Sequence, residues 1–524
     1  MVFTSTVFLF AFLPVAIVTF YLFPPRLRAI PLLVLSSLFY GWGEPALVVL
    51  ILVSAVLNYA FGRLLAREKP TRPRALLVLG IALNLLPLLV FKYLHWLLTL
   101  LGLSSVAADV RLPLPIGVSF YTFMAISYLV DIYRRRNVGA PSLLTFAGYL
   151  TMFPHLVAGP IVRWGQVGPQ LLAPRFDPGL FGYGALRVAT GLVKKVVIAD
   201  SISPVVDALF ASGNPTSWGA AWVAALLYSL QIYFDFSAYS DIAIGLAAML
   251  GVRFEENFRY PYVSKSAREF WQRWHISLGS WFRDYVYIPL GGSRVRPALL
   301  WRNLLVVWAL TGLWHGAAWT FVLWGLYFGV IIGFERGALG RAVERLPVPA
   351  QHAYGLLVAV LGWVIFRSVS VQQAGAYVRS MFFLGGVPAW DGRATYAIAQ
   401  TFVVAVLGIV LAASAGRRIM DAAERFFTGH LEPDAWHKGE AHNPPVAAHA
   451  REHAEGLVSA ATPTAVIAEQ IVAARARDEA VPPGERGHVA RVSLVVSVVV
   501  AALLLVATAF VVAVTYSPFI YFRF

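Results

Sequence analysis

One histidine, His315, lies near the middle of a stretch that contains no Asp, Glu, Lys or Arg, from Asn303 to Phe334. Ionisable side chains at bilayer depth are costly, and they usually face a protein interior or a water-filled cavity. The small neighbours Gly312 and Gly316 leave room for a substrate, although small residues are also how membrane helices pack. Because imidazole titrates close to neutrality, we predict that His315 is a general base.

A second histidine, His275, belongs to a segment over 265–288 whose apolar residues recur at helical spacing: Trp271, Trp274, His275, Leu278, Trp281, Phe282 and Tyr285. This pattern predicts one amphipathic helix at the membrane interface. A histidine among tryptophans is usually a satisfied core residue. Beside His315, however, it could orient or support a base, because a buried pair of imidazoles can supply both a base and an orienting partner.

Two further acids, Asp235 and Asp241, occur in the apolar run 228–250. An unpaired carboxylate there would be expensive, and Lys194 and Lys195 are candidate partners. Six-residue spacing turns the two acids to different helix faces, so we interpret them as structural rather than catalytic. The basic segment 253–302 suits either anionic lipid headgroups or a phosphorylated donor.

The composition favours lipid over water as the solvent. Of 524 residues, 59% are hydrophobic and 13% charged, against about 25% charged in soluble proteins. The net charge of +15 is distributed over short loops, which favours positive-inside orientation over nucleic-acid binding. Cysteine is absent, which excludes thiolate nucleophiles and iron–sulfur clusters, and no nucleotide-binding loop or serine-hydrolase elbow occurs.

Long apolar runs predict an all-α fold, a polytopic transmembrane helical bundle, because only helices or closed barrels span membranes. Between residues 131 and 169, Pro and Gly residues interrupt the apolar stretches, which predicts re-entrant or in-plane helices there. Basic residues in alternate early loops predict an N-terminus on the extracytoplasmic side of the membrane. The expected spans are 2–23, 28–41, 45–66, 75–97, 116–133, 183–209, 217–234, 236–250, 303–334 (with a break), 352–369, 398–415 and 491–514.

The composition changes after residue 416. We predict a transmembrane core over 1–416, a solvent-exposed insertion over 417–490, and a C-terminal helix with an aromatic tail over 491–524. The insertion is charged with both signs and carries several histidines, whose spacing matches no familiar ligand set. We therefore predict a solvated polar segment and no metal site.

Five blocks of the sequence resemble the membrane-bound O-acyltransferase family, and within it the bacterial branch that acetylates alginate. They are MVFTSTVFLF (1–10), YFDFSAYSD (233–241), FWQRWHISL (270–278), WHGA (314–317) and PFIYFRF (518–524). The resemblance implies that His315 corresponds to the family's catalytic histidine and His275 to its second functional histidine. We also expect Trp274, Trp314 and Arg268 to line the substrate channel.

The resemblance further implies a helical bundle in which a cytoplasmic funnel for an acyl thioester meets an extracytoplasmic opening. The expected reaction moves an acetyl group, from acetyl-CoA or another thioester, toward an exopolysaccharide such as alginate. We expect no permanently bound cofactor. The expected partners are a periplasmic acetyltransferase, membrane lipids and, indirectly, the polysaccharide acceptor. The expected location is the bacterial inner membrane.

Three alternatives stay open at this point. One is export of D-alanyl or another acyl group to a cell-wall polymer. A second is a transporter or flippase without covalent chemistry, for which broken helices would be typical. A third is a scaffold for a secretion complex, in which His315 would be dispensable.

Overall fold

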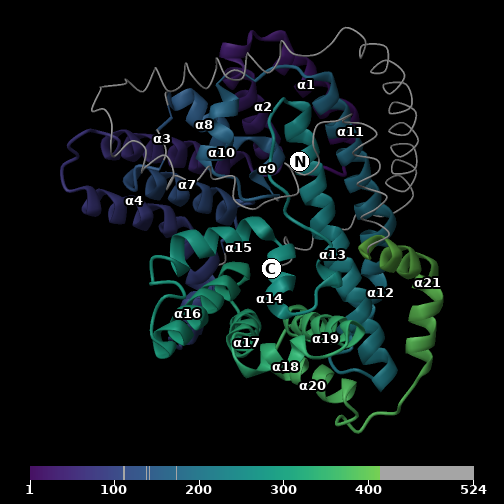
Figure 1. Cartoon of the computed structure of the whole chain (residues 1–524). Helices are drawn as coiled ribbons and strands as arrows, with labels where there is room; N and C mark the ends of the chain where they lie inside the picture. Colours follow the sequence, from purple (N-terminus) through teal and green to yellow (C-terminus); the bar gives the residue numbers. More distant parts are fainter. Residues whose placement is uncertain (110–111, 137–138, 141, 158, 173, 414–524) are drawn as a thin grey trace.

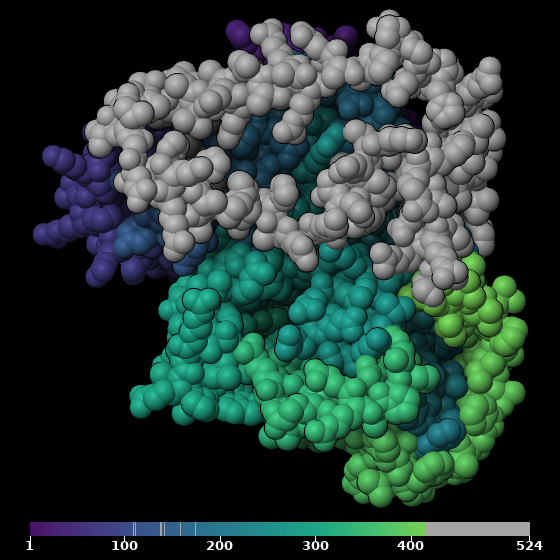
Figure 2. Space-filling view, in the orientation of Figure 1, coloured from purple at the N-terminus to yellow at the C-terminus, as the bar shows by residue number. Residues whose placement is uncertain are grey.

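The computed structural model describes residues 1–413, except 110–111, 137–138, 141, 158 and 173 (Figure 1). All regular structure in these residues is helical, which confirms the predicted all-α class. The predicted insertion at 417–490 and the final segment at 491–524 lie outside the described residues. Figure 2 shows the green residues and many of the teal ones in the lower part of the molecule.

The described residues of the first half contain ten α-helices, several of them short. They are α1 (Leu13–Leu22), α2 (Ala29–Gly41), α3 (Val48–Leu65), α4 (Pro73–Leu88), α5 (Leu94–Leu100), α6 (Ser104–Asp109), α7 (Val118–Tyr133), α8 (Leu143–Thr151), α9 (Phe153–Leu156) and α10 (Trp164–Leu171). A π-helical segment η4 (Leu89–Tyr93) joins α4 to α5. Helices α8 to α10 are too short to span a bilayer, as predicted for this region.

The second half begins with the long helices at the centre of Figure 1. It consists of α11 (Pro178–Val193), the π-helical η5 (Lys194–Ala199), α12 (Asp200–Ala211), α13 (Trp218–Met249), α14 (Ala267–Arg273), α15 (Ile276–Phe282), the π-helical η7 (Arg283–Tyr287), α16 (Pro297–His315), α17 (Trp319–Glu335), α18 (Ala338–Glu344), α19 (Val348–Arg367), α20 (Val371–Met381) and α21 (Gly392–Ala412).

Four helical stretches among the described residues are long and apolar enough to cross a membrane: Pro45–Leu65, Pro73–Leu100, Val348–Arg367 and Gly392–Ala412. A fifth span results if α17 and α18, which are bent by 73°, count together. Shorter apolar helices accompany them at Phe8–Leu22, Ala29–Gly41 and Val118–Tyr133. The chain is therefore a multi-pass membrane protein.

Helix α13 corrects the predicted division into spans 217–234 and 236–250, because it is one helix of 32 residues. At about 1.5 Å per residue it is roughly 48 Å long. Ser217 caps its first turn by accepting a hydrogen bond from the Ala220 amide at 2.9 Å. At its end, Gly251 adopts a positive φ of 75°, and the Val252 amide donates back to the Ala247 carbonyl at 2.9 Å, which is a glycine-terminated helix end.

The charge at Asp235 does not interrupt α13 because a cation compensates it. Lys195 Nζ lies 2.7 Å from Asp235 and 2.6 Å from Asp200. Asp241 is likewise held by Lys194 at 2.6 Å and by Arg187 at 2.5 Å. These pairs confirm the structural interpretation of the two acids and join α11, η5 and α12 to α13.

Glycines let α11 approach α13 closely. A Cβ added to Gly184 would collide with the Gly245 carbonyl, and one added to Gly245 would collide with the Gly184 carbonyl. Small residues at such contacts are how membrane helices associate. The central helices therefore form a rigid support for the elements packed beneath them in Figure 1.

The prediction of one continuous helix over 265–288 was wrong, because the structure contains two helices there. Helix α14 ends at Arg273, and α15 begins at Ile276. The break is fixed by a neighbouring segment: the Ile276 amide donates to the Asn257 carbonyl at 3.0 Å, and the Arg259 amide to the Arg273 carbonyl at 2.9 Å. These tertiary hydrogen bonds override the helical periodicity and place His275 at the break.

Candidate active site

His315 is the last residue of α16, directly before the tight connection to α17. The backbone is extended at Gly316 and Ala318, so the two helices form a hairpin. A Cβ on Gly312 would collide with the Phe321 carbonyl, and one on Gly316 with the Phe321 ring. These glycines therefore close the hairpin, while Ala317 and Ala318 line a neighbouring cavity.

Aromatic rings surround His315, whose side chain is almost completely buried. The centroid of its ring lies 4.8 Å from Trp314, 4.9 Å from Trp324 and 5.1 Å from Phe366, each in an edge-to-face arrangement. Such packing fixes the ring orientation and restricts access of bulk water. A base in this position is protected from side reactions with solvent.

His275 is also buried, and its backbone is left-handed, with φ 45° and ψ 53°. A non-glycine residue in this region is uncommon, and such strain is often found at functional sites. The conformation turns the imidazole inward, where it packs edge-to-face on Phe236 at 4.6 Å. Sequence periodicity alone could not predict this local geometry.

Asn257 determines which nitrogen of His275 carries the proton. Its Oδ1 accepts from the Ser277 amide at 3.2 Å and from the Ser277 hydroxyl at 2.9 Å. Because those contacts identify this atom as the oxygen, His275 Nδ1 must donate to it, at 3.2 Å. Nε2 is then a lone-pair acceptor, and it has no hydrogen-bond partner among the described residues.

Trp314 connects the two histidines. Its ring centroid lies 5.8 Å from that of His275 and 4.8 Å from that of His315. The fold thus brings together two residues that are 40 positions apart in sequence. This proximity is what the predicted roles of base and supporting group require.

The three expected channel residues lie in different surroundings. Trp274 is buried in an aromatic stack, with its ring 4.6 Å from Trp363. Trp314 lies between the histidines, whereas the Arg268 side chain is exposed on α14 and its backbone amide binds Glu335 at 2.9 Å. A channel function for these residues stays a prediction.

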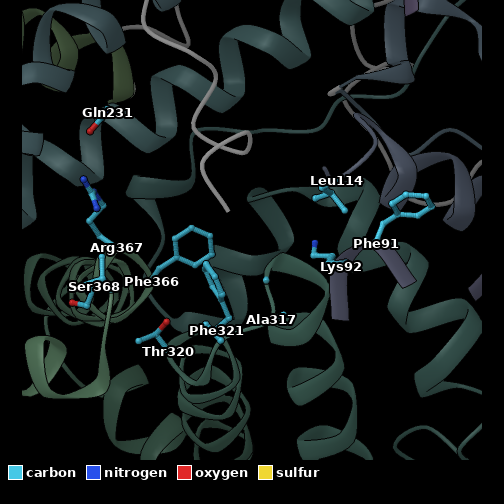
Figure 3. A pocket seen from close by; sticks show the side chains of 13 residues that line it. Phe91, Lys92, Leu114, Gln231, Ala317, Thr320, Phe321, Phe366, Arg367 and Ser368 are labelled. Atoms are coloured by element: carbon cyan, nitrogen blue, oxygen red, sulfur yellow. The ribbon is translucent and has the colours of Figure 1, made fainter. Parts of the chain in front are cut away.

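A cavity of about 480 Å³ opens beside the end of α16 (Figure 3). Its lining combines aromatic rings with polar groups from several elements: Phe91, Lys92, Leu114, Gln231, Gly316, Ala317, Ala318, Thr320, Phe321, Phe366, Arg367, Ser368 and Val369. Its volume is typical of a small-molecule site. Residues adjacent to His315 in sequence thus form part of its wall.

Two residues of this region were not predicted from the sequence. Lys92 is the only charged residue in the expected span 75–97, and the rule that singled out His315 would have identified it. Asn257 has no comparable signal, because its role depends on contacts with Ser277 and Ser240 that only the fold creates. In the part of the chain that the structure describes, no cluster of three potential metal ligands occurs.

Known proteins with similar sequences identify the family of this chain. Residues 73–369 match the profile of MBOAT, the membrane-bound O-acyltransferase family. A probable alginate O-acetylase of Azotobacter vinelandii is 41% identical over 394 residues, covering 74% of this chain and 79% of that protein. One of Pseudomonas aeruginosa is 42% identical over 394 residues, covering 74% and 75%.

A peptidoglycan O-acetyltransferase of Helicobacter pylori is 32% identical over 426 residues, covering 74% of this chain and 81% of that protein. The family match extends over more than half of the chain and includes both His275 and His315. The chain therefore belongs to the membrane-bound O-acyltransferase family and is an O-acyltransferase.

Proposed function

We propose that this enzyme takes an acetyl group from a cytoplasmic thioester, acetyl-CoA, and moves it across the bacterial inner membrane for O-acetylation of an exopolysaccharide. The observation that carries the proposal is the position of His315, at the buried end of α16 beside His275 and next to the 480 Å³ cavity. The names of the relatives, which acetylate alginate or peptidoglycan, support acetyl as the cargo.

His315 is the general base in this proposal. Its imidazole removes the proton from the acceptor hydroxyl, and the oxygen attacks the thioester carbonyl carbon. The carbon–sulfur bond then breaks, and the thiolate takes the proton from the imidazolium. General base catalysis of this kind contributes about 100- to 10,000-fold in rate.

His275, whose ring also lies near Trp314, supports this reaction. Asn257 holds its Nδ1–H, so the Nε2 lone pair is available to accept a hydrogen bond from the reacting groups. This role orients the reactants and does not replace the base. His275→Ala is therefore expected to slow turnover less than His315→Ala.

The proposed topology places the N-terminus on the extracytoplasmic side of the membrane and the thioester on the cytoplasmic side. A periplasmic acetyltransferase then receives the acetyl group and completes modification of a polysaccharide such as alginate. The support for this orientation is the alternation of basic loops early in the chain, with Arg26 and Arg28 on the cytoplasmic side.

The experiment measures acetyl transfer or hydrolysis from radiolabelled acetyl-CoA by the purified full chain in lipid nanodiscs. Wild type should turn over, His315→Ala should not, and His352→Ala is the matched control because His352 lies at the start of α19, outside the site. A D-alanyl carrier-protein thioester serves as a second donor. Turnover with that donor alone would contradict the acetyl assignment, and turnover with neither would favour transport.

A further inference from the structure

Lys92 carries a charge that the fold does not neutralise. Its Nζ donates to the Trp314 carbonyl at 2.5 Å, and no carboxylate lies within ion-pair distance of it among the described residues. Lys194, Lys195 and Arg367, in contrast, each have an acidic partner at 2.6 to 2.8 Å. Because a charge inside a membrane protein is costly, the exception indicates that the charge itself has a function.

This ammonium group is fixed beside the residue that we assign as the base. The carbonyl that it binds belongs to the peptide bond between Trp314 and His315. Tyr93, the next residue of the π-helical η4, donates to the preceding carbonyl, that of Leu313, at 2.9 Å. Segments of π-helix are frequent at functional sites. Here the segment directs two successive donors at the end of α16 and so holds Lys92 Nζ next to the His315 backbone.

Capping of α16 does not explain why the donor is charged. The last carbonyls of a helix lack partners within the helix, and Tyr93 satisfies one of them with a neutral hydroxyl. The attraction of a cation to the helix dipole is small compared with the cost of a charge in the membrane. An ammonium group has three N–H donors, and the Trp314 carbonyl uses one of them. The charge and two donors of Lys92 are therefore left for another acceptor.

The nitrogen of Lys92 faces the cavity in Figure 3, which Ala317 of the α16–α17 hairpin also lines. The other cation of the described lining, Arg367, is paired with Asp207 at 2.8 Å. Gln231 presents an oxygen, Oε1, that has no hydrogen-bond partner among the described residues, and an acceptor oxygen does not stabilise negative charge. Lys92 is thus the described side chain of the lining whose positive charge is available to an anion.

The reaction itself creates such an anion. When the acceptor oxygen attacks the thioester, the electron pair of the carbonyl double bond moves to the carbonyl oxygen and makes it negative. Donors placed in advance at that oxygen are usually a large part of catalysis by acyl-transferring enzymes. The aromatic rings of Phe321 and Phe366 line the same cavity, and a charge–charge interaction is stronger in such surroundings than in water.

We propose that the Lys92 ammonium group donates a hydrogen bond to this oxyanion, so that Lys92 is a second catalytic residue beside His315. The inference rests on the proposed function and adds a residue to its mechanism. Lys92 keeps its proton throughout. As the carbon–sulfur bond breaks, the electron pair returns from the oxyanion to the carbonyl, and the imidazolium of His315 protonates the thiolate. Lys92 therefore stabilises charge and is not the base.

The kinetic test compares Lys92→Gln with wild type as full chains in nanodiscs, with unfolding measured on the same samples. Gln keeps a neutral donor for the Trp314 carbonyl but removes the charge. The value of kcat should fall about 100- to 1000-fold, the loss typical of one oxyanion donor, while KM should stay nearly constant because the oxyanion forms only during the reaction. Lys92→Arg should recover most of the rate.

Tyr93→Phe is the matched control, because it removes a hydrogen bond to the same end of α16 without removing a charge. It should lower the unfolding midpoint and leave kcat near that of wild type. An equal fall of kcat in Tyr93→Phe and Lys92→Gln would reduce Lys92 to a helix cap and overturn the proposal.

Binding of two analogues of the donor tests the charge directly. Acetonyl-CoA is a ketone that mimics the bound thioester, and trifluoroacetonyl-CoA forms a tetrahedral hydrate that mimics the intermediate. Wild type should bind the trifluoro compound about tenfold or more tightly than the ketone, as expected of a charge-assisted hydrogen bond. Lys92→Gln should lose this preference and keep its affinity for the ketone.

An unchanged preference in Lys92→Gln, or a kcat of the folded variant above about a tenth of the wild-type value, would overturn the proposal. The kinetic comparison uses whichever thioester the wild type turns over, acetyl-CoA or the D-alanyl carrier protein, since both contain the carbonyl on which Lys92 acts. Turnover of neither thioester by wild type would instead contradict the proposed function, and this inference with it.

Discussion

Two sets of buried polar side chains in this protein differ in how completely they are paired. Between α11 and α13, Lys195 and Asp235, like Lys194 and Asp241, form ion pairs at 2.6 to 2.7 Å. Around the end of α16, His275 Nε2 and Gln231 Oε1 have no hydrogen-bond partner among the described residues. Lys92 there has no acidic partner in the same part of the chain.

This difference distinguishes side chains that support the fold from side chains that can take part in the reaction. Charges held in ion pairs bring nothing to a substrate, but they hold the long helices in register. Groups with remaining hydrogen-bonding capacity are costly when buried, so they persist where a ligand or a reaction uses them. Substitutions in one set at a time test this difference.

The largest effect is expected from breaking the paired set. Lys195→Met leaves Asp235 and Asp200 buried without their cation, and removal of one partner of a buried pair costs about 3–5 kcal/mol. The unfolding midpoint of the variant in nanodiscs should fall accordingly. Turnover per folded molecule should stay near wild type, and a selective loss of turnover would break the distinction between the two sets.

The second prediction concerns the tautomer of His275. Asn257→Leu removes the acceptor of Nδ1–H, so the ring is free to rotate and turnover should fall roughly 5- to 150-fold, the equivalent of about 1–3 kcal/mol. Asn257→Asp keeps an acceptor and should recover most of the activity. The pH profile of turnover should shift between the two variants; identical profiles and equal losses would reduce Asn257 to a packing residue.

The third prediction, similar in size to the second, concerns the hairpin that presents His315. Gly312→Ala places a methyl group against the Phe321 carbonyl, and overpacking of this kind costs about 1–3 kcal/mol. Because the strain falls between α16 and α17, it should lower kcat more than affinity for the thioester. Gly375→Ala, in open space on α20, is the matched control and should change neither quantity.

Much of this architecture could be predicted from the sequence because lipid imposes simple rules. His315 was identified by its isolation in an apolar run, and the pairing of Asp235 and Asp241 by the cost of buried charge. The predicted break in α13 was wrong because Lys195, distant in sequence, compensates Asp235. The sequence suggested Lys195 as a candidate partner of Asp235, but it did not show that the helix would continue through the pair.

The site was less predictable than the fold for the same reason. Periodicity over 265–288 predicted a continuous helix, whereas hydrogen bonds to Asn257 break it at His275. The identity of His275 as a functional candidate therefore came from its residue type and from family resemblance. Its tautomer, and the cavity charge of Lys92, required the three-dimensional contacts.

The most direct test of the central claim compares His315→Ala with Lys195→Met in one assay of acetyl-CoA turnover, with unfolding measured on the same samples. We expect His315→Ala to unfold like wild type and to react at least about 100-fold more slowly. Lys195→Met should instead unfold more easily and keep near wild-type turnover per folded molecule. Turnover of folded His315→Ala above about a tenth of the wild-type rate would contradict its role as the base.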